Sequence, residues 1–126
     1  MSRRSINVAN ASHKNPIPSA CRIGNIVYSS AIVPRDPVTR EIPPELSVQV
    51  ELMFAQMREV LAAAGATPDH VIKVEIRMLD SSQRDVINAQ WLQMFPDPQS
   101  RPARHIARAQ LDFGQAVQCD FIAVIE

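Results

Sequence analysis

The chain has 126 residues, which is enough for one domain with a buried core. Its 13 lysine and arginine residues balance 13 aspartate and glutamate residues, so the formal net charge is zero. This balance argues against a protein that binds nucleic acid or an anionic membrane through its charge. The N-terminal residues lack the apolar stretch that is typical of a secretory signal, and no apolar run reaches the length of a membrane span. We expect residues 1–126 to form a single cytoplasmic domain, with its two distant cysteines reduced.

The N-terminal third predicts two strands and a long loop. A short strand is expected over residues 5–9, before a polar stretch that contains two prolines. The turn signal of residues 22–25 precedes a β-prone run over residues 26–33. The proline-rich residues 34–44 then predict a loop.

Residues 46–64 carry the clearest helical pattern of the chain. Apolar side chains recur there at the i, i+3, i+4 and i+7 spacing of one buried stripe. Gly65 fits the position just beyond a helix end, and Pro68 follows shortly after it. The sequence therefore predicts a helix that ends at about residue 64.

Residues 71–79 alternate, which predicts a strand with one buried face. The apolar positions, which we expect to share that face, are Ile72, Val74, Ile76 and Met78. A second helix is expected over residues 83–95, with capping side chains offered by residues 80–82. Two further strands are expected over residues 103–111 and 116–125.

This order of strands and helices predicts an α+β fold in which two helices cover one face of a mixed sheet. From strand alternation, we expect the other face to carry Arg104, Ile106 and Gln118 among apolar residues. A sheet face that is half apolar is usually buried by a partner. A second copy of the chain is the simplest candidate, in an assembly with closed cyclic symmetry.

The motif Pro102-Ala103-Arg104 carries the strongest chemical signal. An arginine at the start of a late strand can hold a small carboxylate by two parallel hydrogen bonds. The alternative is a structural arginine that forms an ion pair at a subunit interface. No spacing of His, Cys or Asp residues indicates a metal site, so we expect none.

Further segments add to that motif when they are taken together. The ones that matter most are Ile26-Val27-Tyr28-Ser29-Ser30, Asp36-Pro37, Ala63-Ala64-Gly65-Ala66, Val71-Ile72-Lys73-Val74, Asn88 and Trp91. On these residues, from about residue 15 onward, the chain resembles the Rid family, also called YjgF-type or reactive-intermediate deaminases.

The resemblance implies a chorismate-mutase-like α+β domain that forms a homotrimer, with its sites in clefts between subunits. Members of this family that are enzymes hydrolyse enamines and imines to 2-keto acids and ammonia. The resemblance therefore implies a hydrolase-type deaminase that acts on a small carboxylate-bearing substrate. It also implies that the reaction uses neither a metal nor an organic cofactor.

The resemblance also implies roles for four residues. Arg104 would anchor the substrate carboxylate. Ser30 and Ala31 would line the cleft and offer backbone donors, and Asn88 would support the cleft from the second helix.

Four positions depart from the family pattern. Gln118 stands where deaminating members carry a glutamate, and Ile17 stands where they carry a tyrosine. Ile106 replaces a cysteine of many members, and Ala31 replaces a glycine. An amide can hold a water but cannot accept a proton as a carboxylate does. With Ile17 and Ile106 lining the cleft, we expect a bulkier or less polar substrate.

Asp120 leaves alternatives open, because it shares strand parity with Gln118. It could replace the missing acid, or it could pair with Arg104 or Arg108. Two functions also stay open: an imine or enamine deaminase, and a non-catalytic trimeric protein that binds a keto acid or an amino acid. The missing glutamate favours the second. The zero net charge disfavours endoribonuclease activity, which is attached to some relatives.

Overall fold

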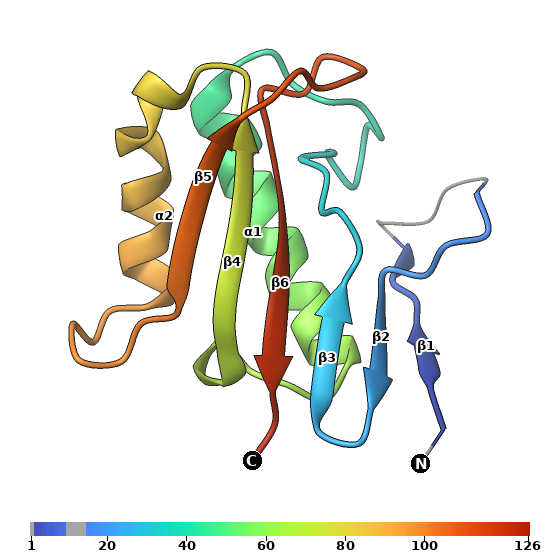
Figure 1. The fold of residues 1–126 in the computed structure, drawn as a ribbon. Helices are drawn as coiled ribbons and strands as arrows, with labels where there is room; N and C mark the ends of the chain where they lie inside the picture. The colour runs from blue at the N-terminus through green and yellow to red at the C-terminus, as the bar shows by residue number, and fades with distance from the viewer. Residues whose placement is uncertain (1, 10–14) are drawn as a thin grey trace.

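The computed structural model describes residues 2–9 and 15–126, which form one sheet and two helices (Figure 1). In chain order, the elements are β1 (Arg4–Ile6), β2 (Ala20–Ile23), β3 (Ile26–Ser29), α1 (Leu46–Ala63), β4 (Val71–Met78), α2 (Asp85–Met94), β5 (Ala103–Arg108) and β6 (Val117–Val124). Two short 3-10 turns, η2 (Pro68–His70) and η3 (Ser81–Gln83), precede β4 and α2. Within the described part of the chain, no helix is long and apolar enough to cross a membrane.

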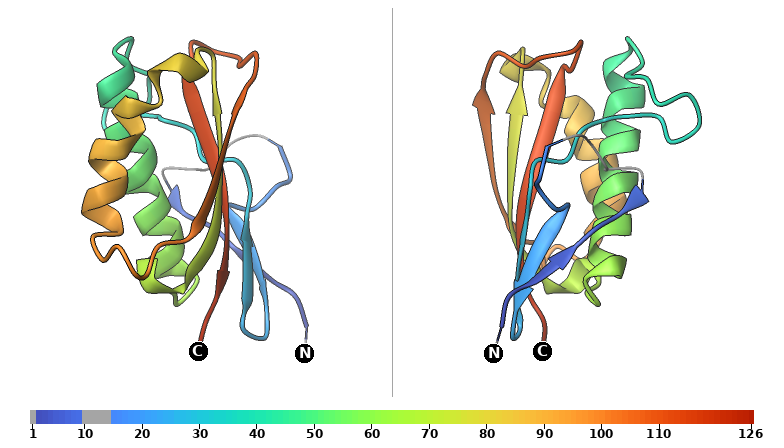
Figure 2. Two further views of the ribbon diagram at one scale, coloured as in Figure 1. Left: turned by 60° about the vertical axis from the view of Figure 1, so that its left-hand side comes forward. Right: turned by 90° about the vertical axis from the view of Figure 1, so that its right-hand side faces the viewer.

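The six strands lie in the order β1-β2-β3-β6-β4-β5, so β5 forms one edge of the sheet. β4 and β5 run parallel and are joined through α2, whereas the other neighbouring strands are antiparallel. Both helices pack on the same face, and the opposite face is left open (Figure 2). The predicted α+β fold with two helices on one face of a mixed sheet is confirmed.

The predicted first helix is confirmed, and its end has a physical reason. The backbone N–H of Ala66 donates to the Leu61 carbonyl, and Gly65 takes a φ of +80° that only glycine adopts without strain. The Arg22 side chain donates from Nη1 to the Ala64 carbonyl at 2.8 Å. A Cβ atom on Gly65 would lie 3.0 Å from that nitrogen. The C-terminus of α1 is thus closed by a long-range contact.

β2 was not predicted, although the turn that follows it was. Gly24 and Asn25 form the loop of a two-residue hairpin, because Ile23 pairs with Ile26 across it. β2 is only four residues long and contains a charged residue, Arg22, on the helix-covered side. Alternation of polar and apolar residues therefore could not identify it.

The predicted face of β4 is wrong at one residue. Ile72 is 52% exposed, whereas Val71 is buried. The register of β4 against β6 shifts between Val71 and Lys73, so a bulge turns Ile72 away from the core. Val74, Ile76 and Met78 face the core as expected.

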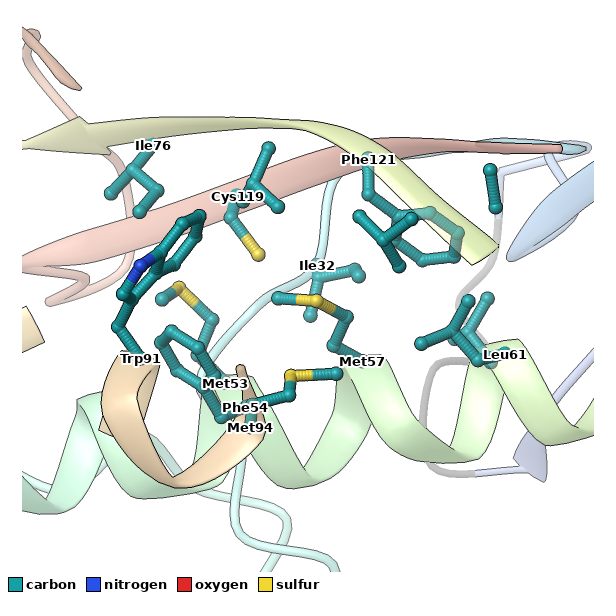
Figure 3. Close-up of a cluster of buried hydrophobic side chains, with 14 of the residues drawn as sticks. Ile32, Met53, Phe54, Met57, Leu61, Ile76, Trp91, Met94, Cys119 and Phe121 are labelled. Carbon is teal, nitrogen blue, oxygen red and sulfur yellow. The ribbon is translucent and has the colours of Figure 1, made fainter. Parts of the chain in front are cut away.

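The core lies between the sheet and the two helices (Figure 3). Buried side chains of α1 meet buried side chains of β4, β6 and α2 there: Met53, Phe54, Met57 and Leu61 from α1, Ile76 from β4, Cys119 and Phe121 from β6, and Trp91 and Met94 from α2. Burial of one such large side chain contributes about 1.5–3 kcal/mol. Burial, and then the charge of Asp120, raises the pKa of the Cys119 thiol, so this cysteine is a packing residue.

Candidate functional site

Arg104 and Ile106 lie on the helix-covered side of the sheet, so their predicted place on the open face is wrong. In the parallel pair of β4 and β5, Arg104 is the partner of Val74 and Ile106 is the partner of Ile76. Val74 and Ile76 are buried under the helices, and residues paired in register share a face. Because β5 is an edge strand, Arg104 nevertheless stays half-exposed beside α2.

The Arg104 side chain is held by two uncharged groups of α2. Its Nη1 donates to Asn88 Oδ1 at 3.0 Å, and its guanidinium carbon lies 4.9 Å from the centre of the Trp91 ring. An amide oxygen and an aromatic face both orient a cation without neutralising it. Among residues 2–9 and 15–126, no Asp or Glu oxygen lies within 4.0 Å of the Arg104 guanidinium.

The charge of Arg104 is therefore partly desolvated and unneutralised. Burial lowers the pKa of Arg104, and the nearby positive charge of Arg84 lowers it further. An arginine remains protonated at physiological pH in spite of such shifts. This geometry suits an anionic ligand, because a carboxylate would relieve the repulsion and use the remaining N–H donors in parallel.

Ser30, Ala31 and Ile17 gather at the other end of the sheet, beyond β3. The Ser30 hydroxyl donates to the Pro18 carbonyl at 2.7 Å, and the Ser30 N–H donates to the Ser19 carbonyl at 2.9 Å. Ile17 is 53% exposed. Beside these residues lies a hollow of about 430 Å³ that is lined by Arg3, Ser5, Pro16, Pro18, Ala20, Cys21, Tyr28, Ser29 and Ser30.

Ala31 and Gln118 face the open side of the sheet. Ile32 forms an antiparallel bridge with Cys119, and both of these residues point into the core. Ala31 therefore lies next to Asp120 in register, with Gln118 two residues away along β6. Within the described residues, the Ala31 N–H has no hydrogen-bond acceptor, so it is a free donor, whereas that of Ser30 is occupied.

Asp120 pairs with Arg77, which contradicts the expected pairing with Arg104 or Arg108. Arg77 Nη1 donates to Asp120 Oδ2 at 3.0 Å across the pair of β4 and β6. Gln118 Nε2 donates to Gln115 Oε1 at 3.3 Å. Asp120 is thus already paired with a cation, whereas the amide oxygen of Gln118 accepts no hydrogen bond from the residues that the structure describes.

The predicted site residues fall into two groups that one chain does not bring together. We call Arg104, Asn88 and Ile106, together with the Trp91 ring that supports the arginine, the Arg104 cluster, and we call Ile17, Ser30, Ala31 and Gln118 the Ser30 cluster. β5 and β3 are separated by β4 and β6, which amounts to about 14 Å across the sheet. In addition, the Arg104 cluster lies on the helix side, and Ala31 and Gln118 lie on the open side.

Sequence reasoning missed two residues that act on Arg104. Trp91 was singled out only as a position that resembles the family, but its ring also supports the arginine. Arg84 was not singled out, although Arg84, Asn88 and Trp91 follow the i, i+4, i+7 spacing of one helix face. That spacing was the available signal. In the part of the chain that the structure describes, no three His, Cys, Asp or Glu side chains are placed to hold a metal ion.

Comparison with known proteins identifies the family. Residues 9–125 match the model of the family described as endoribonuclease L-PSP. A curated relative from Escherichia coli strain K12, named "Putative reactive intermediate deaminase TdcF", is 27% identical over 111 residues, which cover 86% of each chain.

Two solved structures share the whole fold. RidA from the Antarctic bacterium Psychrobacter sp. PAMC 21119 has a TM-score of 0.88 and 27% identity, covering 97% of this chain and 99% of that chain. E. coli TdcF with bound serine has a TM-score of 0.88 and 25% identity, covering 98% of this chain and 99% of that one. The chain therefore belongs to the endoribonuclease L-PSP family, which is the YjgF/Rid family.

Proposed function

We propose that this protein hydrolyses a small imine or enamine that carries a carboxylate, and that the site forms between two copies of the chain. The observation that carries the proposal is Arg104, a half-buried cation held by Asn88 and Trp91 with no acid beside it in the described residues. The name of the relative TdcF, "Putative reactive intermediate deaminase", supports the reaction class. The products are the corresponding keto acid and ammonia.

The reaction consumes only water. The water oxygen forms a bond to the imine carbon while the C=N double bond becomes a single bond, and one water proton moves to nitrogen. The hydroxyl proton of this carbinolamine then moves to nitrogen as the C–N bond breaks. Ammonia leaves and the carbonyl remains. A site that accelerates these steps holds the carboxylate, orients the water and excludes competing solvent.

The two clusters supply complementary parts of such a site. Arg104 keeps N–H donors beyond the one used by Asn88, so it can hold a carboxylate. The free N–H of Ala31 can donate to substrate or to the developing carbinolamine oxygen. The free amide oxygen of Gln118 can accept a hydrogen bond from the attacking water. Gln118 orients that water without taking its proton.

A neighbouring copy is required because the clusters lie apart in one chain. The open face of the sheet also offers an apolar patch, formed by Ile23, Ile26, Tyr28 and Val124. Ile23, Ile26 and Tyr28 are each about half exposed: 48%, 51% and 54%. We infer that copies of the chain bury this patch in a cyclic trimer, with the Arg104 cluster of one copy against the Ser30 cluster of the next.

The charges of the open face do not favour a nucleic acid as the ligand. Lys73 and Arg77, its basic residues on β4, lie within 4 Å of Glu75 or Asp120. Phosphate binding depends on cations that are free to neutralise it. Arg104 lies in a half-buried corner with one further arginine, Arg84, close enough to affect its pKa, and this corner fits a small carboxylate-bearing ligand better than a polymer.

The test is imine hydrolysis in a coupled assay. An amino-acid oxidase generates imino acids from several amino acids, and semicarbazide traps them as an absorbing product. We expect the wild-type protein to reduce the trapped signal, and Gln118→Glu to reduce it further because a carboxylate can accept the proton. Ligand-induced thermal stabilisation with no turnover by either protein would refute the proposal and identify a binding protein.

A further inference from the structure

Arg84 adds a second cation to the helix face that holds Arg104. Its backbone angles, φ −60° and ψ −21°, continue the helix, so its side chain leaves α2 on the same face as Asn88 and Trp91. Arg84 precedes Asn88 by four residues, which is about 6 Å along the helix axis. Asn88, which accepts the hydrogen bond from Arg104, therefore lies one helical turn after Arg84 on this face.

The Arg84 guanidinium is anchored but not neutralised. Its Nε donates to the Ser81 carbonyl at 3.1 Å, which holds it against η3, the turn that contacts β5. In the described residues, no Asp or Glu oxygen lies within 4.0 Å of it. The charge of Arg84 lowers the pKa of Arg104, so this repulsion disfavours the charged form of Arg104. An anion that bridged the two would remove this repulsion.

The acidic residues nearest in sequence are not placed to relieve Arg84. Asp80 accepts hydrogen bonds from the Ser82 N–H and hydroxyl, and these bonds, with the charge of Arg108, lower the pKa of Asp80. Asp85 is the next residue on α2, and neighbouring helix residues point in different directions. The charge of Arg108 thus acts on Asp80, whereas the charge of Arg84 acts on Arg104.

Ile106 provides an apolar surface on the same side of β5. It lies two residues after Arg104 on the same face, is half-buried, and packs against the edge of the core. The surface therefore offers a cation, an apolar stretch and a second cation. The Ser30 cluster adds no free acid that would repel a second negative charge, because Asp120 is paired with Arg77 and Gln118 is neutral.

We propose that the ligand of this site is a dicarboxylate, with one carboxylate on Arg104, the other on Arg84 and its carbon chain against Ile106. The substrate class is then the imine or enamine of a keto dicarboxylic acid. This inference rests on the proposed function for the position of the site and adds the chemistry of the ligand. It keeps the expected apolar contact at Ile106 but replaces a less polar substrate with a doubly charged one.

The test compares two keto acids of equal carbon number by isothermal titration calorimetry. 2-Oxoglutarate and 2-oxopentanoate differ only in having a carboxylate or a methyl group at the far end. We expect the wild-type protein to bind 2-oxoglutarate about tenfold or more tightly, which is the worth of one charge-assisted hydrogen bond. The preference should shrink at high salt.

Arg84→Gln removes the charge and keeps a side-chain donor for the Ser81 carbonyl. It should abolish the preference by weakening only 2-oxoglutarate. Arg58→Gln is the matched control, because Arg58 is an exposed arginine of α1, and it should keep the preference. Equal affinity of the wild-type protein for both ligands, binding of neither, or an equal loss for both in Arg84→Gln would overturn the assignment.

The outcomes separate this inference from the proposed reaction. A dicarboxylate preference that depends on Arg84, in a protein without turnover, would refute the deaminase and leave the ligand class standing. Turnover of monocarboxylate imines, with no preference for the second carboxylate, would refute the ligand class alone.

Discussion

Two arginines on neighbouring strands of this sheet have opposite environments. Arg77 of β4 faces the open side and lies 3.0 Å from Asp120 and 3.9 Å from Glu75. Arg104 of β5 faces the helices and touches an amide and an indole ring. Acidic side chains neutralise the charge of Arg77, whereas the charge of Arg104 is not neutralised by any of the described residues.

This contrast separates an arginine that supports structure from one that can bind a ligand. An exposed ion pair such as Arg77 with Asp120 contributes about 0–1 kcal/mol to stability and leaves no charge for a ligand. Arg104 gains little from its neutral partners, but its orientation is fixed before a ligand arrives. Preorganised donors of this kind lose less entropy on binding. The comparison predicts that the two positions respond differently to the same substitution.

The largest effect is expected at Arg104 itself. Arg104→Ala should lower kcat/KM for a carboxylate-bearing imine by about 100-fold, because the paired charge-assisted hydrogen bonds are lost. Arg77→Ala, the matched control, should change kcat/KM by less than about threefold, as expected for a surface pair. Steady-state kinetics in the semicarbazide assay measures both. Equal losses would show that Arg104 acts no differently from a structural arginine.

A smaller effect is expected when Arg104 is kept but the hydrogen bond that orients its side chain is removed. Asn88→Ala deletes the 3.0 Å hydrogen bond, so the guanidinium should lose its fixed direction. We expect KM to rise about tenfold while kcat stays within about twofold, as when a binding group alone is weakened. Asn88→Asp is the informative companion, since the new carboxylate would neutralise Arg104 and raise KM further. A fall in kcat with constant KM would contradict a positioning role.

The smallest effect is expected at the open-face ion pair. A double-mutant cycle with Arg77→Ala and Asp120→Ala should give a coupling of about 0.5 kcal/mol or less in urea unfolding. Activity should remain in Asp120→Ala if Asp120 is not the catalytic acid. Loss of turnover in Asp120→Ala, with assembly intact by light scattering, would show that Asp120 acts in place of the glutamate that Gln118 replaces.

The sequence predicted the elements with strong periodicity and failed where pairing decides the outcome. Helix α1 has a continuous apolar stripe and a glycine stop, which are both local signals. β5 reads Ala-Arg-His-Ile-Ala-Arg and has no apolar face, so only its pairing with β4 shows that Arg104 lies under α2. The alternation of apolar and polar residues likewise gives no sign of the bulge at Ile72.

For the same reason, the sequence predicted only part of the candidate site. Arg104 stood out as a residue type in a motif, and Asn88 was expected to lie in the same cleft. Three features depend on the tertiary structure: the contact between these two residues, the position of Trp91 beneath the guanidinium, and the pairing of Asp120 with Arg77. Neither alternation nor motif spacing contains them, because each depends on which strands become neighbours.

Subunit complementation tests most directly whether the site is shared between copies. Arg104→Ala disables the first cluster, and Ile17→Glu places a carboxylate in the second, where it would repel substrate. Each variant alone should keep about a hundredth of the wild-type activity or less. After co-refolding in equal amounts, random assembly should restore about a quarter of the wild-type activity, since one interface in four then pairs two intact clusters. Mixed assemblies that form, by native mass spectrometry, but remain inactive would contradict a site shared between neighbouring chains.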